Sequence, residues 1–255
     1  MRVKTLPIPS AYLLVSHGSH DPRPEIAMQQ LAKLVCNKLP KNYKALNSEH
    51  LVGIAALEMS PQPLHEQIQQ FAKSAFCNCK PSENENRLKI VPLFLLPGVH
   101  VMTDIPAEVS LAQQAIGQDI MIEVQPYLGS HPNLEKLLAK QTASIKAEAW
   151  ILLAHGSRRT GSQETVEAMA ASLSAVAAYW AGPPSLESRV KELVTAGYKE
   201  IAILPYFLFA GGITDAIAAS IEELKLQFSA VNFQLAEPLG ASAELAEIIW
   251  DLTDR

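Results

Sequence analysis

YLLVSHGS (residues 12–19) and WILLAHGS (residues 150–157) are the two stretches that decide the fold. Each is a short, continuous apolar run that ends in His-Gly-Ser. Such a run is typical of a strand buried on both faces, as in a parallel sheet covered by helices. Because the same pattern occurs twice, the sequence indicates an internal duplication.

Further matched segments extend this duplication along the chain. VPLFL at 91–95 matches LPYFL at 204–208, and Thr103-Asp104 matches Thr214-Asp215. The second copy is shorter, and its missing residues fall where the first copy has polar stretches. Loops tolerate such length changes, whereas packed elements do not. We therefore predict two related halves, residues 1–147 and residues 148–255.

Each half has alternating strand and helix patterns. In the first half, apolar runs predict strands over 11–16, 51–57, 88–95 and 119–126. Asp21 followed by Pro22 is typical of a helix start, and we expect further helices over 61–76, from a Thr103 cap to 116, and over 133–146. This alternation predicts an α/β fold of two similar lobes, each a mainly parallel sheet flanked by helices, facing each other across a cleft.

Composition excludes several functions. The chain has 255 residues, of which 48% are apolar and 18% charged, which is typical of a globular protein. The net charge is −5 with no basic run, which argues against a nucleic-acid partner. No apolar stretch reaches the ~18 residues of a membrane span, and the first residues lack a signal-peptide core. The three cysteines, Cys36, Cys77 and Cys79, fit a reducing compartment rather than a disulfide framework, so we expect a cytoplasmic location.

Polar side chains follow three strands of the first half directly. His17 follows the first strand, Glu58 the second and His100 the third. Ligands of open parallel sheets bind beyond the carboxyl ends of the strands. Two imidazoles and one carboxylate can hold a divalent metal that still accepts another ligand. The other first-half histidines lack this placement and are predicted to lie on the surface: His20, His50, His65 and His131.

Each candidate also has a purely structural interpretation when it is taken alone. His17 suits a capping or packing position, Glu58 a surface or capping position, and His100 an exposed loop. Their joint occurrence at successive strand ends favours the metal site. The second half keeps His155, but we expect Trp180 at the position equivalent to Glu58. The Gly-Gly-Ile stretch at 211–213 is expected at the position equivalent to His100. The sequence thus predicts one metal site, in the first half, with the second half as a wall of the cleft.

Three segments resemble a known family. LLVSHGSHDPR (13–23), VPLFLLPGVHVMTDIPAEV (91–109) and LPYFLFAGGITDAI (204–217) are similar to the class II tetrapyrrole chelatases of the CbiX/SirB type, in their long, duplicated form. The resemblance implies two chelatase-like lobes that hold sirohydrochlorin, into which Co²⁺ or Fe²⁺ is inserted with release of two pyrrole protons, in cobalamin or siroheme biosynthesis. It implies His17 and His100 as catalytic residues and metal ligands, Glu58 as a further metal ligand, and no cofactor beyond the substrate metal.

The same resemblance implies contacts to the macrocycle. Sirohydrochlorin carries several carboxylates, which arginines and helix N-termini can bind, although the arginines also suit a solvated surface. The predicted substrate-binding residues are Ser19, Arg23, Gly98, Val99, His155 and Arg158. Because one duplicated chain supplies both lobes, we expect a monomer.

Two other functions remain open at this point. A non-catalytic carrier of the tetrapyrrole or of the metal would use the same histidines. A His-dependent phosphatase would also have a histidine at a strand end, but it needs an arginine beside that histidine. Ser16 and Ala154 stand at those positions, which argues against the phosphatase.

Overall fold

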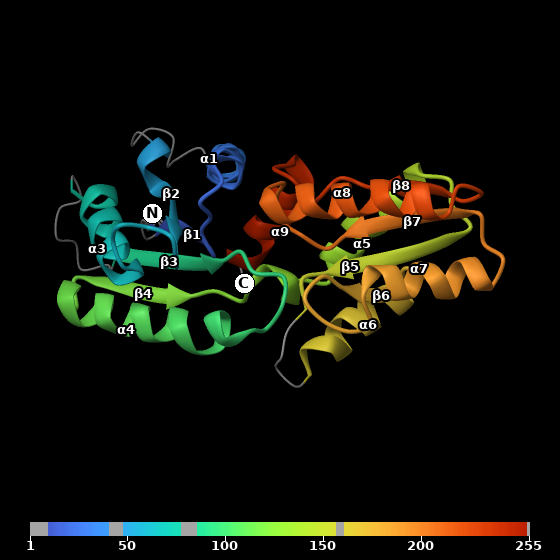
Figure 1. Cartoon of the computed structure of the whole chain (residues 1–255). Coiled ribbons are helices and arrows are strands. Elements are labelled where there is room, and N and C mark those ends of the chain that lie inside the picture. Colours follow the sequence, from blue (N-terminus) through green and yellow to red (C-terminus); the bar gives the residue numbers. More distant parts are fainter. Residues whose placement is uncertain (1–9, 41–47, 78–85, 157–160, 254–255) are drawn as a thin grey trace.

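The computed structural model describes residues 10–40, 48–77, 86–156 and 161–253. It has two α/β lobes side by side (Figure 1). Each lobe contains a four-stranded sheet whose pairings are all parallel, so the predicted fold class is confirmed.

The first sheet has the strand order β2-β1-β3-β4. β1 pairs with β2 and with β3, so the central strand is the one that carries YLLVS. Helices α1 and α9 pack against each other, as do α3 and α4, and the sheet lies between these pairs (Figure 1). The elements of the first repeat are β1 (Ser10–Ser16), α1 (Pro22–Cys36), β2 (Val52–Ala56), α3 (Leu64–Ala75), β3 (Asn86–Pro92), α4 (Ile105–Ile116), β4 (Ile120–Val124) and α5 (Asn133–Ser144).

The second sheet repeats this topology in the order β6-β5-β7-β8. WILLA forms its central strand, β5, which pairs with β6 and β7. The same order of pairing in both sheets agrees with a duplicated chain. The elements are β5 (Ala149–Ala154), α6 (Ser162–Ser172), β6 (Val176–Tyr179), α7 (Leu186–Thr195), β7 (Glu200–Pro205), α8 (Gly212–Gln227), β8 (Asn232–Leu235) and α9 (Ala243–Thr253).

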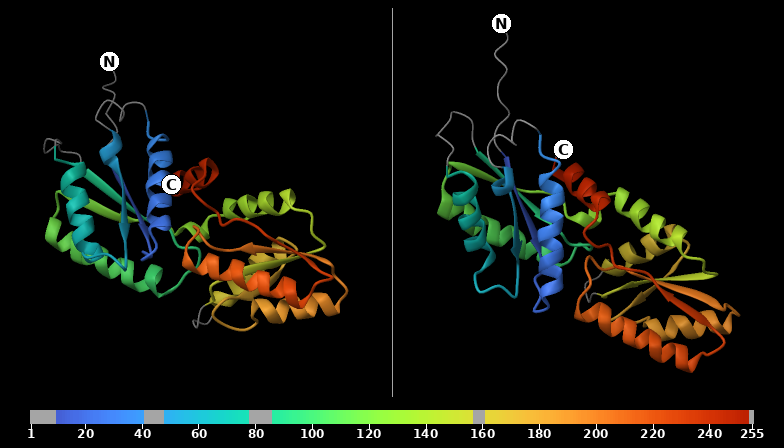
Figure 2. Two further views of the ribbon diagram at one scale, coloured as in Figure 1. Left: turned by 45° about the horizontal axis from the view of Figure 1, so that its top comes forward. Right: turned by 90° about the horizontal axis from the view of Figure 1, so that it is seen from above.

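The last helix of each repeat lies against the opposite lobe. Helix α9 packs on α1 and β3 of the first lobe, where the Trp250 ring lies 5.5 Å from the Tyr12 ring. Lys38 pairs with Glu247, and Lys89 binds the carbonyl of Thr253. Helix α5 lies beside the second sheet in both views of Figure 2. This exchange ties the lobes together, so each half of the sequence contributes to both lobes.

Several predicted boundaries differ from the structure. Strand β3 ends at Pro92 rather than at residue 95, and α3 begins at Leu64 rather than at residue 61. The third helix does not begin at a Thr103 cap, because a π-helical turn over His100–Asp104 precedes α4. The predicted start of α1 is confirmed, since the Asp21 side chain accepts a hydrogen bond from the Arg23 N–H. No helix in the described ranges is long and apolar enough to cross a membrane.

Candidate metal centre

The chain places His17, Glu58 and His100 at one edge of the first sheet. His17 follows β1 directly, and Glu58 lies two residues beyond β2. The backbone N–H of Glu58 donates to the His17 carbonyl at 2.8 Å, which extends the strand pairing to these two residues. His100 begins the π-helical turn that follows β3 and Pro97-Gly98. The neighbouring parallel strands thus bring the three side chains together.

Gly18 permits this close approach. Its φ of +97° is one that side-chain-bearing residues rarely adopt. A Cβ at this position would lie 2.0 Å from the carbonyl oxygen of Glu58. Only glycine therefore lets the turn after His17 cross the backbone of Glu58.

The ligand atoms are nearly in place for a metal ion. One ligand atom from each of the three residues lies within 4.8 Å of the other two. Nε2 of His17 is 3.6 Å from Oε2 of Glu58, and the rings of His17 and His100 are 5.0 Å apart, edge to face. Ligand atoms around a tetrahedral ion with bonds of about 2.1 Å lie about 3.4 Å apart. A small contraction would bring all three onto one ion.

Hydrogen-bond acceptors lie beside Nδ1 of both rings. Nδ1 of His17 lies 3.3 Å from the Gly18 carbonyl, and Nδ1 of His100 lies 2.8 Å from Oδ2 of Asp104. A carbonyl and a carboxylate are acceptors only, so both contacts favour the tautomer with the proton on Nδ1. Each neutral ring then has its lone pair on Nε2, the atom that can bind a metal.

Asp104 is a site residue that sequence reasoning missed. The signal was the His-x-x-x-Asp spacing from His100 to Asp104, which places two side chains on one face of a helical turn. It went unused because the helix was expected to begin at Thr103, which would have left His100 in a loop.

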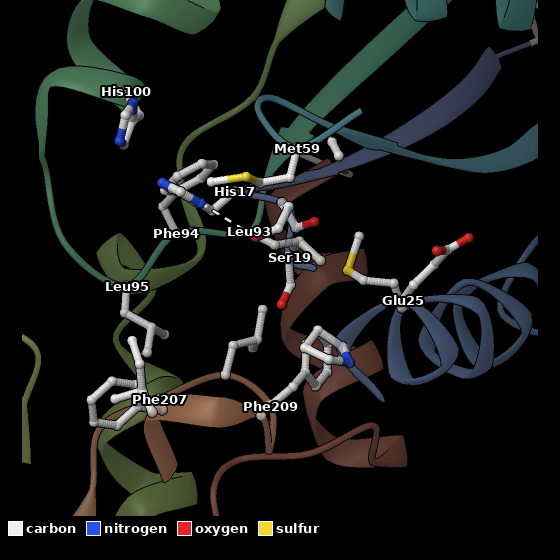
Figure 3. Close-up of a pocket in the computed structure, with 18 of the residues that line it drawn as sticks. His17, Ser19, Glu25, Met59, Leu93, Phe94, Leu95, His100, Phe207 and Phe209 are labelled. Atoms are coloured by element: carbon white, nitrogen blue, oxygen red, sulfur yellow. Dashed lines mark hydrogen bonds between the residues drawn. The ribbon is translucent and has the colours of Figure 1, made fainter. Parts of the chain in front are cut away.

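A cavity of about 860 Å³ opens in front of the two histidines, between the lobes (Figure 3). His17, His100 and Phe94 lie on one side of it, and Phe207 and Phe209 of the second lobe lie opposite (Figure 3). Its other lining residues include the predicted substrate contacts Ser19, Gly98, Val99 and His155. The volume is within the 300–1,000 Å³ typical of small-molecule sites, and the walls are mostly apolar.

The second repeat lacks two of the three candidate ligands. His155 keeps the contact of its Nδ1 to the following carbonyl, at 3.2 Å. The residue equivalent to Glu58 is Ala181 rather than the expected Trp180. The backbone N–H of Ala181 donates to the His155 carbonyl, just as the N–H of Glu58 donates to the His17 carbonyl. The stretch opposite His100 is Gly211-Gly212-Ile213, as expected. Among the described residues, no other group of three His, Cys, Asp or Glu side chains is close enough to hold a metal ion.

Arg23, which precedes the cavity-lining Pro24, joins the two lobes. Its guanidinium binds Asp21 and makes two bonds to Asp215 of α8, at 2.5 and 3.0 Å. These bonds lower the pKa of Asp21 to about 2, lower the pKa of Asp215 and raise that of Arg23. Arg23 is thus already neutralised by two carboxylates. Arg158, the other predicted substrate arginine, lies outside the described residues, as does Cys79.

The remaining histidines differ in their surroundings. His20 and His50 are exposed, as predicted. His131 is buried, so the prediction that it lies on the surface was wrong; the C-terminal part of the chain covers it, and Asp251 of α9 lies 3.9 Å from its Nε2. His65 is half-buried and binds Glu108 of α4 at 2.9 Å.

The fold and site define a two-lobed α/β protein with a cluster of two histidines and a glutamate in its first lobe, placed to hold a metal ion beside a cavity between the lobes. The model of the CbiX family matches residues 11–145 and again residues 149–255, so the chain belongs to the CbiX family.

Similar proteins were found by sequence and by structure. The chain is 25% identical over 180 residues to a sirohydrochlorin ferrochelatase of Priestia megaterium, covering 66% of each chain. It is 24% identical over 181 residues to a sirohydrochlorin cobaltochelatase of the same organism, covering 63% of this chain and 57% of that one. The chain thus spans about two thirds or less of the length of these relatives. SirB from Bacillus subtilis, solved with Fe³⁺, has the same fold, with a TM-score of 0.70 at 20% identity over 97% of this chain and 95% of that one.

Proposed function

We propose that this protein is a sirohydrochlorin chelatase, a lyase that inserts Co²⁺ or Fe²⁺ into the macrocycle. The observation that carries the proposal is the cluster of His17, Glu58 and His100 beside a cavity between the lobes. Membership of the CbiX family and the names of the two Priestia megaterium relatives support the same activity. Product formation belongs to cobalamin or siroheme biosynthesis, according to the metal.

The proposed reaction requires side chains that release the metal ion to the macrocycle and that also accept protons from it. The neutral imidazoles of His17 and His100 hold the divalent ion through Nε2, and Glu58 completes the protein ligands. Macrocycle nitrogens replace these ligands as the ion is transferred. Each imidazole released from the metal has a free lone pair and takes one of the two pyrrole protons, which it then passes to solvent. His17 is half-exposed, so this last step has a direct route.

The cavity suits an aromatic macrocycle. The rings of Phe207 and Phe209 form an apolar wall opposite His17 (Figure 3). A flat tetrapyrrole between this wall and the histidines would place one face toward the metal. Its carboxylates would extend to the rim, where the start of α1 and the start of α8 lie. Ser19, Gly98, Val99 and His155 are proposed to contact the macrocycle.

A single chain supplies both sides of this cavity, since residues of both lobes line it. The second lobe provides the wall that a lone first lobe lacks. We therefore propose the monomer as the functional unit, with residues 1–147 carrying the metal site and residues 148–255 carrying the repeat that has lost it.

The test is an anaerobic assay with sirohydrochlorin and Co²⁺ or Fe²⁺ that follows the macrocycle absorbance. Wild type should accelerate insertion, and His17→Ala and His100→Ala should each lose metal binding and most of the rate. His155→Ala is the matched comparison from the second repeat. It should keep metal binding and raise only the KM for the macrocycle.

The same assay separates the enzyme from a carrier. A protein that binds the macrocycle or the metal but gives no rate above the uncatalysed reaction with either metal is a carrier, and the chelatase proposal fails. Equal losses in His155→Ala and His17→Ala would contradict the assignment of the metal to the first lobe.

A further inference from the structure

We propose that Asp104 is a positioning residue that holds the His100 ring in the tautomer and orientation needed to bind and release the metal. The inference rests on the proposed chelatase function. It adds to the metal centre a carboxylate that does not touch the metal but acts through His100.

The geometry of the pair is that of a metal-site histidine and its orienting carboxylate. Nδ1 of His100 donates to Oδ2 of Asp104 at 2.8 Å, which is the length of a strong, charge-assisted hydrogen bond. In metal sites, the second ring nitrogen of a ligating histidine almost always donates to such a group, which fixes the ring and its tautomer. The metal-binding atom of His100 is then Nε2.

Two further contacts hold the ring. Phe94 lies 5.9 Å from it, centre to centre, and the His17 ring meets it edge to face at 5.0 Å. Neither contact selects a tautomer, because neither gives a hydrogen-bond acceptor to Nδ1. Asp104 therefore has a role that the packing around His100 does not supply.

The backbone between the two residues is specialised. His100–Asp104 forms a π-helical turn, in which the Ile105 N–H bonds to the His100 carbonyl. Short π-helical segments within helices occur often at functional sites. The turn runs directly into α4. His100 and Asp104 therefore lie in one continuous helical segment, and their side chains meet.

The duplication provides an internal comparison. The second repeat keeps the aspartate, as Asp215, but has Gly211 four residues earlier, where the first repeat has His100. Asp215 has no histidine to hold and instead binds Arg23 of the other lobe. The two equivalent carboxylates thus differ in partner according to whether a metal ligand is present, and this links the Asp104 bond to the metal centre.

The experiment determines the tautomer of His100 in the full ¹⁵N-labelled chain before any metal is added. In wild type, long-range ¹H–¹⁵N spectra should show the proton on Nδ1. In Asp104→Ala they should show a mixture of both tautomers. In Asp104→Asn, whose amide oxygen still accepts a hydrogen bond, the wild-type tautomer should largely return.

Co²⁺ titration without the macrocycle provides the second measurement. Asp104→Ala should weaken Co²⁺ binding by about 10–100-fold, the usual effect of losing such an orienting group, and Asp104→Asn should recover part of it. The matched control is Glu108→Ala, which removes a His–carboxylate bond of 2.9 Å from the adjoining helix, α4, but at His65, outside the metal centre. It should leave Co²⁺ affinity unchanged.

The outcomes separate this inference from the proposed function. If wild type binds no Co²⁺, the chelatase proposal fails, while the His100 tautomer still tests Asp104. If wild type binds Co²⁺ and Asp104→Ala keeps both the tautomer and the affinity, the role of Asp104 is refuted. An equal loss in Glu108→Ala would show a general effect of disturbing α4 and would also refute it.

Discussion

Replacing Gly18 by alanine tests the geometry of the metal centre, and Gly156→Ala is its matched control. The two glycines are equivalent in the repeats and have similar backbone conformations, with φ of +97° and +93°. They differ in what an added Cβ would meet. At Gly18 it would lie 2.0 Å from the Glu58 carbonyl oxygen, whereas at Gly156 it would lie 3.2 Å from Cβ of Tyr179.

These contacts give the size of the expected effects. Both alanines must adopt a positive φ, which costs about 1–3 kcal/mol. That loss corresponds to roughly 2–4 °C in Tm for each kcal/mol in a chain of about this size. Gly18→Ala must in addition move the Glu58 backbone by about 1 Å to reach a tolerable contact. A misplacement of about 1 Å in a catalytic arrangement can cost about 100-fold.

We therefore expect both variants to be less stable but only Gly18→Ala to lose its metal site. Thermal unfolding gives the stability of each variant. Co²⁺ titration and the rate of insertion into sirohydrochlorin give the state of the site, with an expected loss of about 100-fold for Gly18→Ala and a small change for Gly156→Ala. A folded Gly18→Ala protein whose Co²⁺ affinity stays within about 3-fold of wild type would refute the reasoning. The positions of His17 and Glu58 would then not depend on the close approach of Gly18 to the Glu58 backbone.

Two further predictions concern contacts between the lobes. The buried Tyr206 hydroxyl donates to the Leu95 carbonyl at 3.2 Å, so Tyr206→Phe should lower the free energy of unfolding by about 1 kcal/mol, measured by denaturant titration against the exposed control Tyr198→Phe. Arg23→Gln removes the bonds that lower the pKa of Asp21 to about 2. A carboxylate with a lowered pKa stabilises the fold above its ordinary pKa near 4 and loses this effect as pH falls toward 2. The Tm difference between wild type and Arg23→Gln should thus persist at pH 5–7, shrink as pH falls below about 4 and be lost below about pH 2; a difference that grows on acidification would contradict this.

The fold was predictable because its strands are buried on both faces. AYLLVS at 11–16 and the equivalent run at 150–154 have no polar residue before their ends, so their type and approximate bounds follow from the sequence alone. The parallel arrangement then predicts that residues after successive strands meet at one edge. The structure brings His17, Glu58 and His100 together there.

The features that were missed depend on local register or on contacts distant in sequence. Ala181 is the equivalent of Glu58 because hydrogen bonds beyond the strand ends set how the two repeats align. An alignment with a constant sequence offset gave Trp180, one residue too early. Asp104 was missed because the start of the helix was expected three residues late. His131 is buried by the C-terminal part of the chain, and no pattern near residue 131 predicts that the end of the chain returns to cover it.

The position equivalent to His100 in the second repeat lies where the two lobes meet. Gly211 stands where the first repeat has His100, and it is buried. A Cβ added there would lie 3.4 Å from Cγ of Pro24 in the first lobe, at ordinary van der Waals distance, so this position packs closely against α1. Gly211 and Pro24 both line the cavity, so this contact closes one side of it. In the proposed chelatase reaction one macrocycle takes one metal ion, so the second repeat is needed as an apolar wall of the cavity and not as a second metal centre.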